Sequence, residues 1–434
     1  MVDLLVLGAT GVTGRQVTLY LNAHPQGSRF TFAIAGRSRR KLDDLVSDLS
    51  LPKSIQVHIV DVTDFDQVEA LVKTSKIVLN TVGPFAKWGP PVVRACARNG
   101  VHYVDLTGEQ LFVRDIIERY DYVATKTGSI IVPSCGLDSL PADIAVHLAN
   151  NALKLLSEDT TSPLQIDTST SSYDLHGVTS NGTISTIVLT LGSTPKHKLV
   201  ESLRDHYLSP VSGRPSPRPR LKYAMTIPST RDVLVGGYFV MTGSNRSIVQ
   251  RSWGLLEWNF LNGKSAEANS QRYGPIIYDE FLCQKNTFRG ILLTLTLLVG
   301  FTLMTLPPVR WIAGRLGVKE TSKNLDKQLQ DGSMRVINVT SSLPSSSFPK
   351  PVKVETVISA KGDPGYYLSP IMMAESALAL LLNTEELPPL AKQGGVLTPA
   401  IALGDAVVKR LQEYANFDIT CEVIEGDAES RKSI

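Results

Sequence analysis

The sequence has little cysteine and almost no net charge, and both scarcities narrow what this chain can be. Its four cysteines are widely separated in 434 residues, so they form neither a metal-binding spacing nor a disulfide framework. We expect free thiols in a reducing compartment and no metal site. The formal net charge is only +3, which gives no basis for binding nucleic acid. The first residues read as a core strand, so we also expect no cleavable signal peptide.

The first residues have the pattern of a dinucleotide-binding turn. Val2–Leu7 is an apolar run typical of a buried strand, a glycine-rich turn follows, and a helical pattern continues to Leu21. Small residues let the backbone approach a pyrophosphate, whose charge then lies at the amides that begin the helix. The first two glycines are separated by two residues rather than one, and a turn without a ligand is the alternative. The residues expected to contact the cofactor here are Gly8, Ala9, Thr10, Gly11, Val12, Thr13 and Gly14.

The end of the second predicted strand, residues 30–35, indicates which dinucleotide binds. An NAD site places a carboxylate there for the ribose 2′-hydroxyl, whereas a site for the 2′-phosphate has cationic donors. No acidic residue occurs in residues 15–42, and the strand is followed by Arg37 and Ser38. The pattern therefore favours NADP(H), with Arg37 as phosphate ligand and Ser38 as its helper. The cations at 39–41 have the alternative of a solvated helix start.

Strands and helices alternate through residue 145, which predicts a doubly wound parallel sheet. Ligands of such sheets lie beyond the carboxyl ends of the strands, so we expect loops 80–85, 105–109 and 135–139 around the nicotinamide. Further cofactor contacts are expected from Asp61, after the third strand, and from Val82, Gly83, Pro84 and Phe85. The candidate proton donors are Asp105, Glu109, Asp138 and Tyr103, and for each of them a structural role such as a helix cap is the alternative.

One pair of residues imitates a different catalytic motif. Tyr122 and Lys126 have the Tyr-x-x-x-Lys spacing of short-chain dehydrogenases. Helical periodicity places both of them opposite the apolar stripe of their predicted helix, residues 109–127. We therefore expect Tyr122 to point to solvent and to take no part in catalysis.

Several ordered blocks of the chain are familiar together. They are residues 8–14, 35–38, 80–85, 103–109 and 136–143, followed by residues 181–183, 362–366 and 394–400. In this order they resemble the saccharopine dehydrogenase-like oxidoreductases, a family that includes mycobacterial trans-acting enoyl reductases and lipid-droplet-associated eukaryotic members. The resemblance implies an α/β fold, with an N-terminal Rossmann domain, a second α/β domain carrying a mixed sheet, and NADP(H) as the cofactor.

The second half of the chain is expected to fit that architecture. We expect an NADP-binding domain at 1–145, a second α/β domain at 146–365 and C-terminal helices at 366–434 that pack back on the first domain. Alternating patterns predict strands at 165–173, 334–340 and 352–360, the last two antiparallel. We also expect a helix start at 182–191, an apolar helix at 367–382 and a basic, irregular loop at 214–222.

One apolar stretch departs from what a soluble relative needs. The sixteen positions from Ile291 to Leu306 contain no charged residue, and they lie in an insert at 289–318 of the second domain. As a helix they would extend about 24 Å, short of the roughly 30 Å hydrocarbon core of a bilayer. Two prolines end the run, and the arginines at 310 and 315 with Trp311 follow. The pattern favours a helix inserted in one leaflet of a membrane or lipid monolayer, with a buried core helix as the alternative.

These observations predict an NADPH-dependent oxidoreductase that reduces the C=C bond of a lipid or glycolipid precursor. We expect it to be membrane-associated on the cytoplasmic side, at a lipid droplet or the endoplasmic reticulum, through Ile291–Leu306. The alternatives are a saccharopine-type reductase of an amino-acid C=N bond and a non-catalytic cofactor-binding protein of lipid droplets. Whether two copies form a homodimer is left open.

Overall fold

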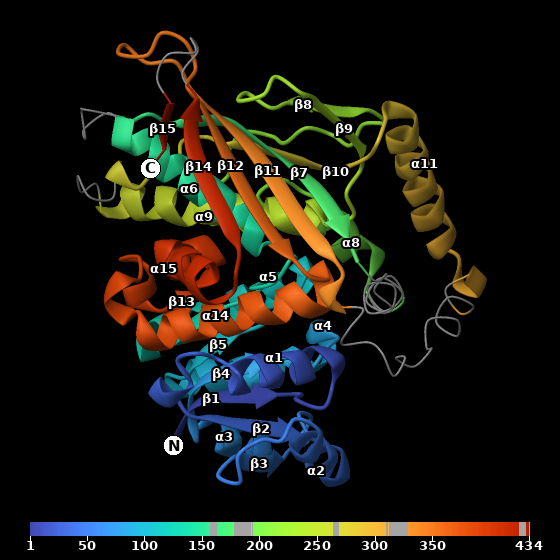
Figure 1. Cartoon of the computed structure of the whole chain (residues 1–434), viewed down its shortest axis with the longest axis vertical. Coiled ribbons are helices and arrows are strands. Elements are labelled where there is room, and N and C mark those ends of the chain that lie inside the picture. Colours follow the sequence, from blue (N-terminus) through green and yellow to red (C-terminus); the bar gives the residue numbers. More distant parts are fainter. Residues whose placement is uncertain are drawn as a thin grey trace. The chain divides into compact units, whose positions relative to one another are not determined.

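The computed structural model describes residues 1–156, 163–177, 192, 194–263, 269–309, 311, 329–424 and 431–433. The chain forms two compact units (Figure 1). Unit 1 comprises Met1–Ile144 and Pro364–Phe417, and unit 2 comprises Ala145–Asp363 and Asp418–Ile434. The predicted helix start at 182–191 and the block at 181–183 lie outside the described residues.

Unit 1 is built on a seven-stranded sheet in the order β13-β6-β5-β4-β1-β2-β3. The pairs are parallel, and the order reverses between β1 and β4, which is the switch point of a doubly wound sheet. The predicted Rossmann sheet is thus confirmed. Its strands are β1 Val2–Leu7, β2 Phe32–Gly36, β3 Gln56–Ile59, β4 Ser75–Asn80, β5 His102–Val104, β6 Ile130–Val132 and β13 Gly395–Val396.

The short strand β13 joins this sheet from the far end of the sequence. It pairs in parallel with β6, through Gly395 opposite Ile130 and Val396 opposite Ile131. The amide of Val396 also donates to the carboxylate of Asp121 at 2.7 Å. The sequence pattern gave no strand here, because two residues are too few to show an alternation.

The helices of unit 1 follow the expected alternation with one difference at α4. Their bounds are α1 Val12–Asn22, α2 Arg39–Asp48, α3 Phe65–Val72, α4 Phe85–Asn99, α5 Gln110–Thr127, α14 Ser369–Leu382 and α15 Pro399–Tyr414, with α6 Leu140–Leu156 continuing into unit 2. Helix α4 begins at Phe85, whereas the sequence pattern predicts a helix from Pro91 to Arg98. Its first amides, of Phe85 and Ala86, donate to the carboxylate of Glu109 at 2.8 and 2.9 Å, which stabilises the early start.

Helix α14 confirms the expected apolar helix at 367–382, and it packs against α1, α15, β4 and β5 within unit 1. A π-helical turn, η2 Pro364–Leu368, leads into it. The expected division of the chain into three domains, with boundaries after residues 145 and 365, stays a prediction. In the structure, residues 364–417 belong with the first sheet, whereas β14 Asp418–Ile424 pairs with the second sheet.

Unit 2 contains a mixed sheet of eight strands in the order β15-β14-β12-β11-β7-β10-β9-β8. Strands β7 and β10 are parallel and the other pairs are antiparallel, which confirms the expected mixed sheet. The strands are β7 Ile166–His176, β8 Tyr223–Thr226, β9 Val233–Gly237, β10 Ile277–Cys283, β11 Ser333–Ser342, β12 Lys353–Lys361, β14 and β15 Arg431–Ser433. The described helices lying wholly in this unit include α8 Lys196–Ser202, α9 Thr242–Gly263 and α11 Thr287–Met304.

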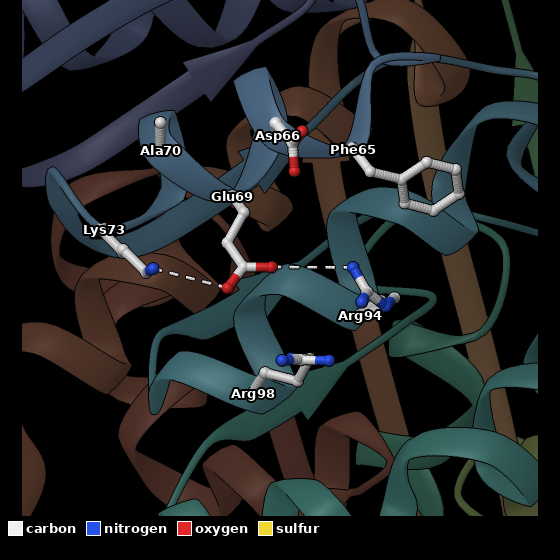
Figure 2. A pocket seen from close by; sticks show the side chains of 7 residues that line it. All are labelled: Phe65, Asp66, Glu69, Ala70, Lys73, Arg94 and Arg98. Carbon is white, nitrogen blue, oxygen red and sulfur yellow. Dashed lines mark ion pairs between the residues drawn. The ribbon is translucent and has the colours of Figure 1, made fainter.

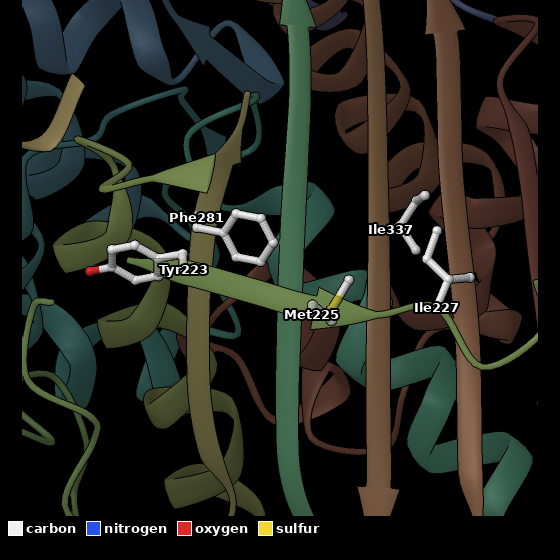
Figure 3. Close-up of a cluster of buried hydrophobic side chains, with 5 residues drawn as sticks. All are labelled: Tyr223, Met225, Ile227, Phe281 and Ile337. Carbon is white, nitrogen blue, oxygen red and sulfur yellow. The ribbon is translucent and has the colours of Figure 1, made fainter. Parts of the chain in front are cut away.

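A cluster of apolar side chains forms where β8 crosses one face of this sheet (Figure 3). Tyr223, Met225 and Ile227 meet Phe281 of β10 and Ile337 of β11, and all five are buried. Alternate residues of each strand point to this face, as strand periodicity requires.

The basic segment 214–222 forms neither a helix nor a strand, as expected. Most of its residues are exposed, and two of its arginines are paired with acids of the sheet. Arg214 pairs with Asp167 of β7, and Arg220 pairs with Asp279 of β10.

Candidate functional site

The glycine-rich turn after β1 leaves no room for side chains at two of its positions. Gly8 has φ +87°, and a Cβ there would lie 2.8 Å from the side chains of Thr81 and Val82. A Cβ on Gly14 would lie 2.3 Å from the carbonyl oxygen of Gly8. Glycine at these positions therefore lets the turn approach β4 and lets α1 pack tightly on β1. The helix begins after Gly11, and no side chain caps its N-terminus.

This cradle is suited to a pyrophosphate. The first turn of α1 carries no acidic residue, so its positive end is not neutralised by the helix itself. The turn lies at the carboxyl end of β1, beside the switch point between β1 and β4. Its residues thus fit the dinucleotide site that the sequence predicts.

The arginines after β2 separate into two kinds. Arg39 bonds to Asp43 at 3.0 Å and Arg40 lies 4.0 Å from Asp44, both pairs one helical turn apart along α2. Arg37 is exposed and makes no ion pair with any residue that the structure describes. Since Arg39 and Arg40 have partners of their own, Arg37 is the arginine of this segment that stays available for a 2′-phosphate.

Two residues predicted to contact the cofactor, Ser38 and Asp61, also have local partners. The Ser38 hydroxyl caps α2, because its Oγ accepts the amide of Lys41 at 3.4 Å. The Asp61 carboxylate accepts both the amide and the hydroxyl of Thr63, at 2.9 and 2.8 Å. Those bonds lower the pKa of Asp61, which keeps the carboxylate charged.

Tyr103 and Asp105 form the centre of a fully buried network. The Tyr103 hydroxyl donates to Asp105 Oδ2 at 2.7 Å and accepts from Asn80 Nδ2 at 3.1 Å. The other oxygen, Asp105 Oδ1, accepts the amides of Thr107 and Ser134 at 2.9 and 3.0 Å. Burial raises the pKa of Asp105 to about 6 and that of Tyr103 well above its ordinary value. The network holds the ends of β4, β5 and β6 together.

Glu109 is half-buried, and both of its carboxylate oxygens are used as acceptors at the start of α4. Burial raises its pKa, and the amides of Ala86 and Phe85 act against that rise. Glu109 therefore caps the N-terminus of α4, a neighbouring helix, and not that of its own helix, α5.

Asp138 differs from the other three candidate acids. It lies between β6 and α6, its side chain is half-buried, and it forms no hydrogen bond with another residue in the described ranges. Burial raises its pKa to about 6. Two serines beside it, Ser134 and Ser139, have φ +65° and +124°, a backbone region that favours glycine. Such local strain is typical of loops that position a functional group.

A serine that the sequence reasoning missed holds this loop in place. The Ser369 hydroxyl, at the start of α14, accepts the amide of Leu137 at 2.9 Å and donates to the carbonyl of Pro364. A Cβ on Gly136 would lie 2.9 Å from Leu106 and 3.2 Å from Ser369. The only signal in the sequence was that residues 362–366 belong to the family-like blocks.

A hollow of about 660 Å³ on unit 1 lies elsewhere, between α3 and α4 (Figure 2). It is lined by Phe65, Asp66, Glu69, Ala70, Lys73, Arg94 and Arg98. Glu69 points into it and pairs with Lys73 at 3.4 Å and with Arg94 at 3.6 Å. None of the predicted site residues lines it, so we do not assign the cofactor to this hollow.

Comparison with known proteins agrees with the geometry. Residues 4–155 match the saccharopine dehydrogenase NADP-binding domain. A Mycobacterium tuberculosis protein, provisionally named a trans-acting enoyl reductase, is 30% identical over 94% of this chain and 95% of its own length. The chain belongs to the saccharopine dehydrogenase-like oxidoreductase family. NADP(H) is the cofactor of this family's N-terminal domain, and the chain is an NADP-dependent oxidoreductase.

Two further comparisons concern a nematode relative and a solved structure of a yeast enzyme. A Caenorhabditis elegans protein named lipid droplet localized protein is 26% identical over 97% of this chain and 98% of its own length. The structure of apo saccharopine dehydrogenase (L-Glu forming) from Saccharomyces cerevisiae aligns with 98% of this chain and 100% of that chain, at a TM-score of 0.53 and 11% identity. The yeast enzyme therefore shares the fold of both units.

Proposed function

We propose that this oxidoreductase is an NADPH-dependent enoyl reductase whose substrate is a lipid or glycolipid precursor. The observation that carries the proposal is the chemical character of the loops beyond the strands of unit 1. Loops 81–85, 105–109 and 133–139 contain no lysine or arginine. The similarity to the mycobacterial trans-acting enoyl reductases, over nearly the whole chain, supports the same reaction class.

A substrate with several carboxylates would need cations to bind it. Arginine and lysine clamps are the usual means of holding such groups, and the three loops supply none. An enoyl lipid needs only an apolar surface, a polarised carbonyl and one proton donor. The composition of these loops suits that substrate better than a saccharopine-type amino acid.

The proton is the part of this reaction that the chain itself must supply. When bound, NADPH supplies the hydride to the β-carbon of an activated C=C bond. A protonated acid then adds a proton to the α-carbon, which leaves a saturated product and NADP⁺. We assign the proton to Asp138, because Tyr103 and Asp105 are fully buried and the Glu109 oxygens accept backbone amides. A pKa of about 6 keeps part of the Asp138 carboxyls protonated near neutral pH.

The experiment is an assay of NADPH oxidation with three substrate sets. These are enoyl thioesters and enoyl lipids, glutamate with the lysine-derived semialdehyde, and no substrate. We expect turnover with the enoyl substrates alone and formation of the saturated product, identified by mass spectrometry. Reduction of the semialdehyde–glutamate pair in place of the enoyl lipids would contradict the proposal, as would NADPH binding without turnover of any substrate.

A matched pair of variants tests the assigned acid. Asp138→Asn removes the proton and keeps the shape, so turnover should fall by roughly 10²–10⁴-fold while NADPH binding is kept. Asp48→Asn is the control, because Asp48 is exposed at the end of α2, away from the strand-end loops. An Asp138→Asn enzyme as active as the Asp48→Asn enzyme would rule out Asp138 as the proton donor.

A further inference from the structure

In the part of the chain that the structure describes, two helices are long and apolar enough to cross a membrane by length and composition, and they differ sharply in their surroundings. In the Pro364–Leu382 segment, which contains α14, 72% of the residues are buried, as expected of a core helix. In α11, Thr287–Met304, only 11% are buried, although its mean hydropathy is higher, at 1.7 against 1.3. The burial expected of a core helix is therefore found in α14. It is not found in α11, which contains most of the Ile291–Leu306 stretch.

The large exposed side chains of α11 lie on one side of the helix, and apolar side chains continue around its other side after Thr294. Its large exposed side chains are Phe288, Leu292, Leu295, Leu298, Val299 and Leu303, followed by Leu306 after the helix ends. At 100° per residue these positions fall on one side of the helix, opposite Gly290 and Thr294. After Thr294 the other side carries Leu297, Phe301 and Met304, which are half-exposed. Apolar side chains therefore surround this part of the helix, and none of residues 295–304 is buried. A protein partner would cover one face of a helix, whereas a lipid environment surrounds it. The distribution of apolar side chains thus favours lipid.

The first turns of α11 are fixed to strand β9 by a contact between backbones. A Cβ on Gly290 would lie 2.2 Å from the carbonyl oxygen of Gly236, and a Cβ on Gly237 would lie 2.3 Å from that of Gly290. One turn later, the Thr294 hydroxyl accepts the amide of Tyr238 at 2.9 Å. Gly290 and Thr294 are the buried residues of the helix. Because three glycines and a threonine form this joint, α11 leaves the sheet in a fixed direction.

The joint also limits how deeply the helix can reach. Beyond Thr294 the free part runs from Leu295 to Leu306. Its helical residues, which end at Met304, extend roughly 15 Å at about 1.5 Å per residue. The hydrocarbon core of a bilayer is about 30 Å thick, so one leaflet offers about half of that depth. The free part therefore matches one leaflet and cannot span two.

The base of α11 carries the charges that a lipid surface would attract. Lys285 and Arg289 are exposed there, and the free part contains no charged residue. With the apolar part in the acyl chains, these two cations would lie at the depth of the headgroups, where they favour anionic lipids.

We propose that α11 is a rigid one-leaflet anchor that inserts into the phospholipid monolayer of a neutral-lipid droplet. The monolayer is chosen because it offers one leaflet and no second one to cross, which is what the 295–306 reach fits. The similarity to a C. elegans lipid droplet localized protein agrees with this choice. The proposal rests on unit 2 alone and holds whether or not the substrate is an enoyl lipid.

The first test is flotation of the full-length protein with triolein droplets coated with phosphatidylcholine and phosphatidylserine. The double variant Leu298→Asp and Val299→Asp should lower the partition coefficient by roughly a hundredfold or more, since each acid is placed among acyl chains. The matched control is Val200→Asp with Leu203→Asp, which changes two exposed apolar residues at α8. Equal loss in both pairs, or no flotation of the parent protein, would overturn the proposal.

The second test concerns the joint and the depth. Gly290→Ala places a Cβ against Gly236, whereas Gly300→Ala places one in open space. With Leu303→Trp as reporter, quenching should be strongest by lipids brominated deep in the acyl chain. Gly290→Ala should weaken that quenching, and Gly300→Ala should leave it unchanged. Circular dichroism and NADPH binding confirm that each variant is folded, so a lost anchor is distinguished from a lost fold or a lost cofactor site.

Two other surroundings of α11, a second copy of the chain and a bilayer that the helix crosses, would give different experimental results. If a second copy of the chain covers the helix, sedimentation will show a dimer that the Leu298→Asp and Val299→Asp variant abolishes. If the segment crosses a bilayer, a tag at the C-terminus will be protected from protease in vesicles. Either result would contradict the one-leaflet anchor.

Discussion

The hydroxyl of Tyr103 donates a 2.7 Å hydrogen bond to the carboxylate of Asp105, and both side chains are fully buried. The second oxygen of Asp105 reaches Thr107 on its own loop and Ser134 on the next one. Two residues that the sequence suggested as proton donors therefore hold the loops around the site. Their pKa values are raised by burial, which shows that a shifted pKa can mark a structural network as well as a catalytic group.

Tyr103→Phe should destabilise unit 1 by about 1–3 kcal/mol. The substitution leaves Asn80 and Asp105 each without one hydrogen-bond partner in a buried position. Urea unfolding at pH 7 measures the change in the free energy of unfolding. The control is Tyr122→Phe, because Tyr122 is 73% exposed, as its helical phase predicts. Equal stability of the two variants would show that the network contributes nothing.

Gly14→Ala should abolish or strongly weaken NADPH binding. Its methyl group would lie 2.3 Å from the Gly8 carbonyl oxygen, so α1 would have to move away from the turn that receives the pyrophosphate. Tryptophan quenching on titration with NADPH measures the affinity. Gly27→Ala is the matched control, since a Cβ at Gly27 meets no atom within 4 Å. Normal NADPH affinity in Gly14→Ala would contradict the assignment of this turn.

The two sheets could be predicted because their signals are local. An apolar run ending in a glycine turn predicts β1, and alternation predicts β11 and β12 with their antiparallel pairing. The mixed sheet of unit 2 is expected from the resemblance of the ordered blocks to the saccharopine dehydrogenase-like family. The exposure of Tyr122 is also predicted correctly, because helical periodicity depends on neighbouring residues alone.

What the sequence could not show depends on contacts between distant residues. The early start of α4 depends on Glu109, and the position of the Asp138 loop depends on Ser369. Strand β13 is defined only by its pairing with β6. Ser38 is a local exception, because its position suits either a phosphate or a helix cap, and only the structure shows the bond to Lys41. The catalytic acid stays a prediction, since three carboxylic acids and one phenol lie near the carboxyl ends of the strands of unit 1.

Arg37→Ala should reduce NADPH affinity by roughly 10–100-fold and leave NADH affinity nearly unchanged. Arg37 is the cation without an ion pair in the described part of this loop, so it is available to the 2′-phosphate that NADH lacks. Titration with both cofactors measures the two affinities. Arg40→Ala is the control, because Arg40 faces Asp44 on the surface of α2. Equal losses for NADPH and NADH would mean that Arg37 does not read the 2′-phosphate.

The rate of reduction should fall as pH rises through about 6. The assigned acid must be protonated to deliver its proton, and burial raises the pKa of Asp138 to about 6. A profile of kcat against pH with saturating NADPH measures this limb. The residual activity of Asp138→Asn should lack it, whereas Asp48→Asn should keep it. A limb that persists in Asp138→Asn would assign the proton to another group.

The same substitution should stabilise the protein at neutral pH. A carboxyl whose folded pKa is raised binds its proton more tightly when folded, so the stability that it contributes is complete below about 4 and is lost as pH rises through about 6. Asparagine carries no such loss. Asp138→Asn should therefore gain about 1–2 kcal/mol over the parent between pH 4 and pH 7, a value reduced because the side chain is only half-buried. Asp105 has a raised pKa in both proteins, so its contribution cancels in the difference. Urea unfolding at the two pH values measures the gain, and its absence would mean that Asp138 is solvated and poorly suited to hold a proton at pH 7.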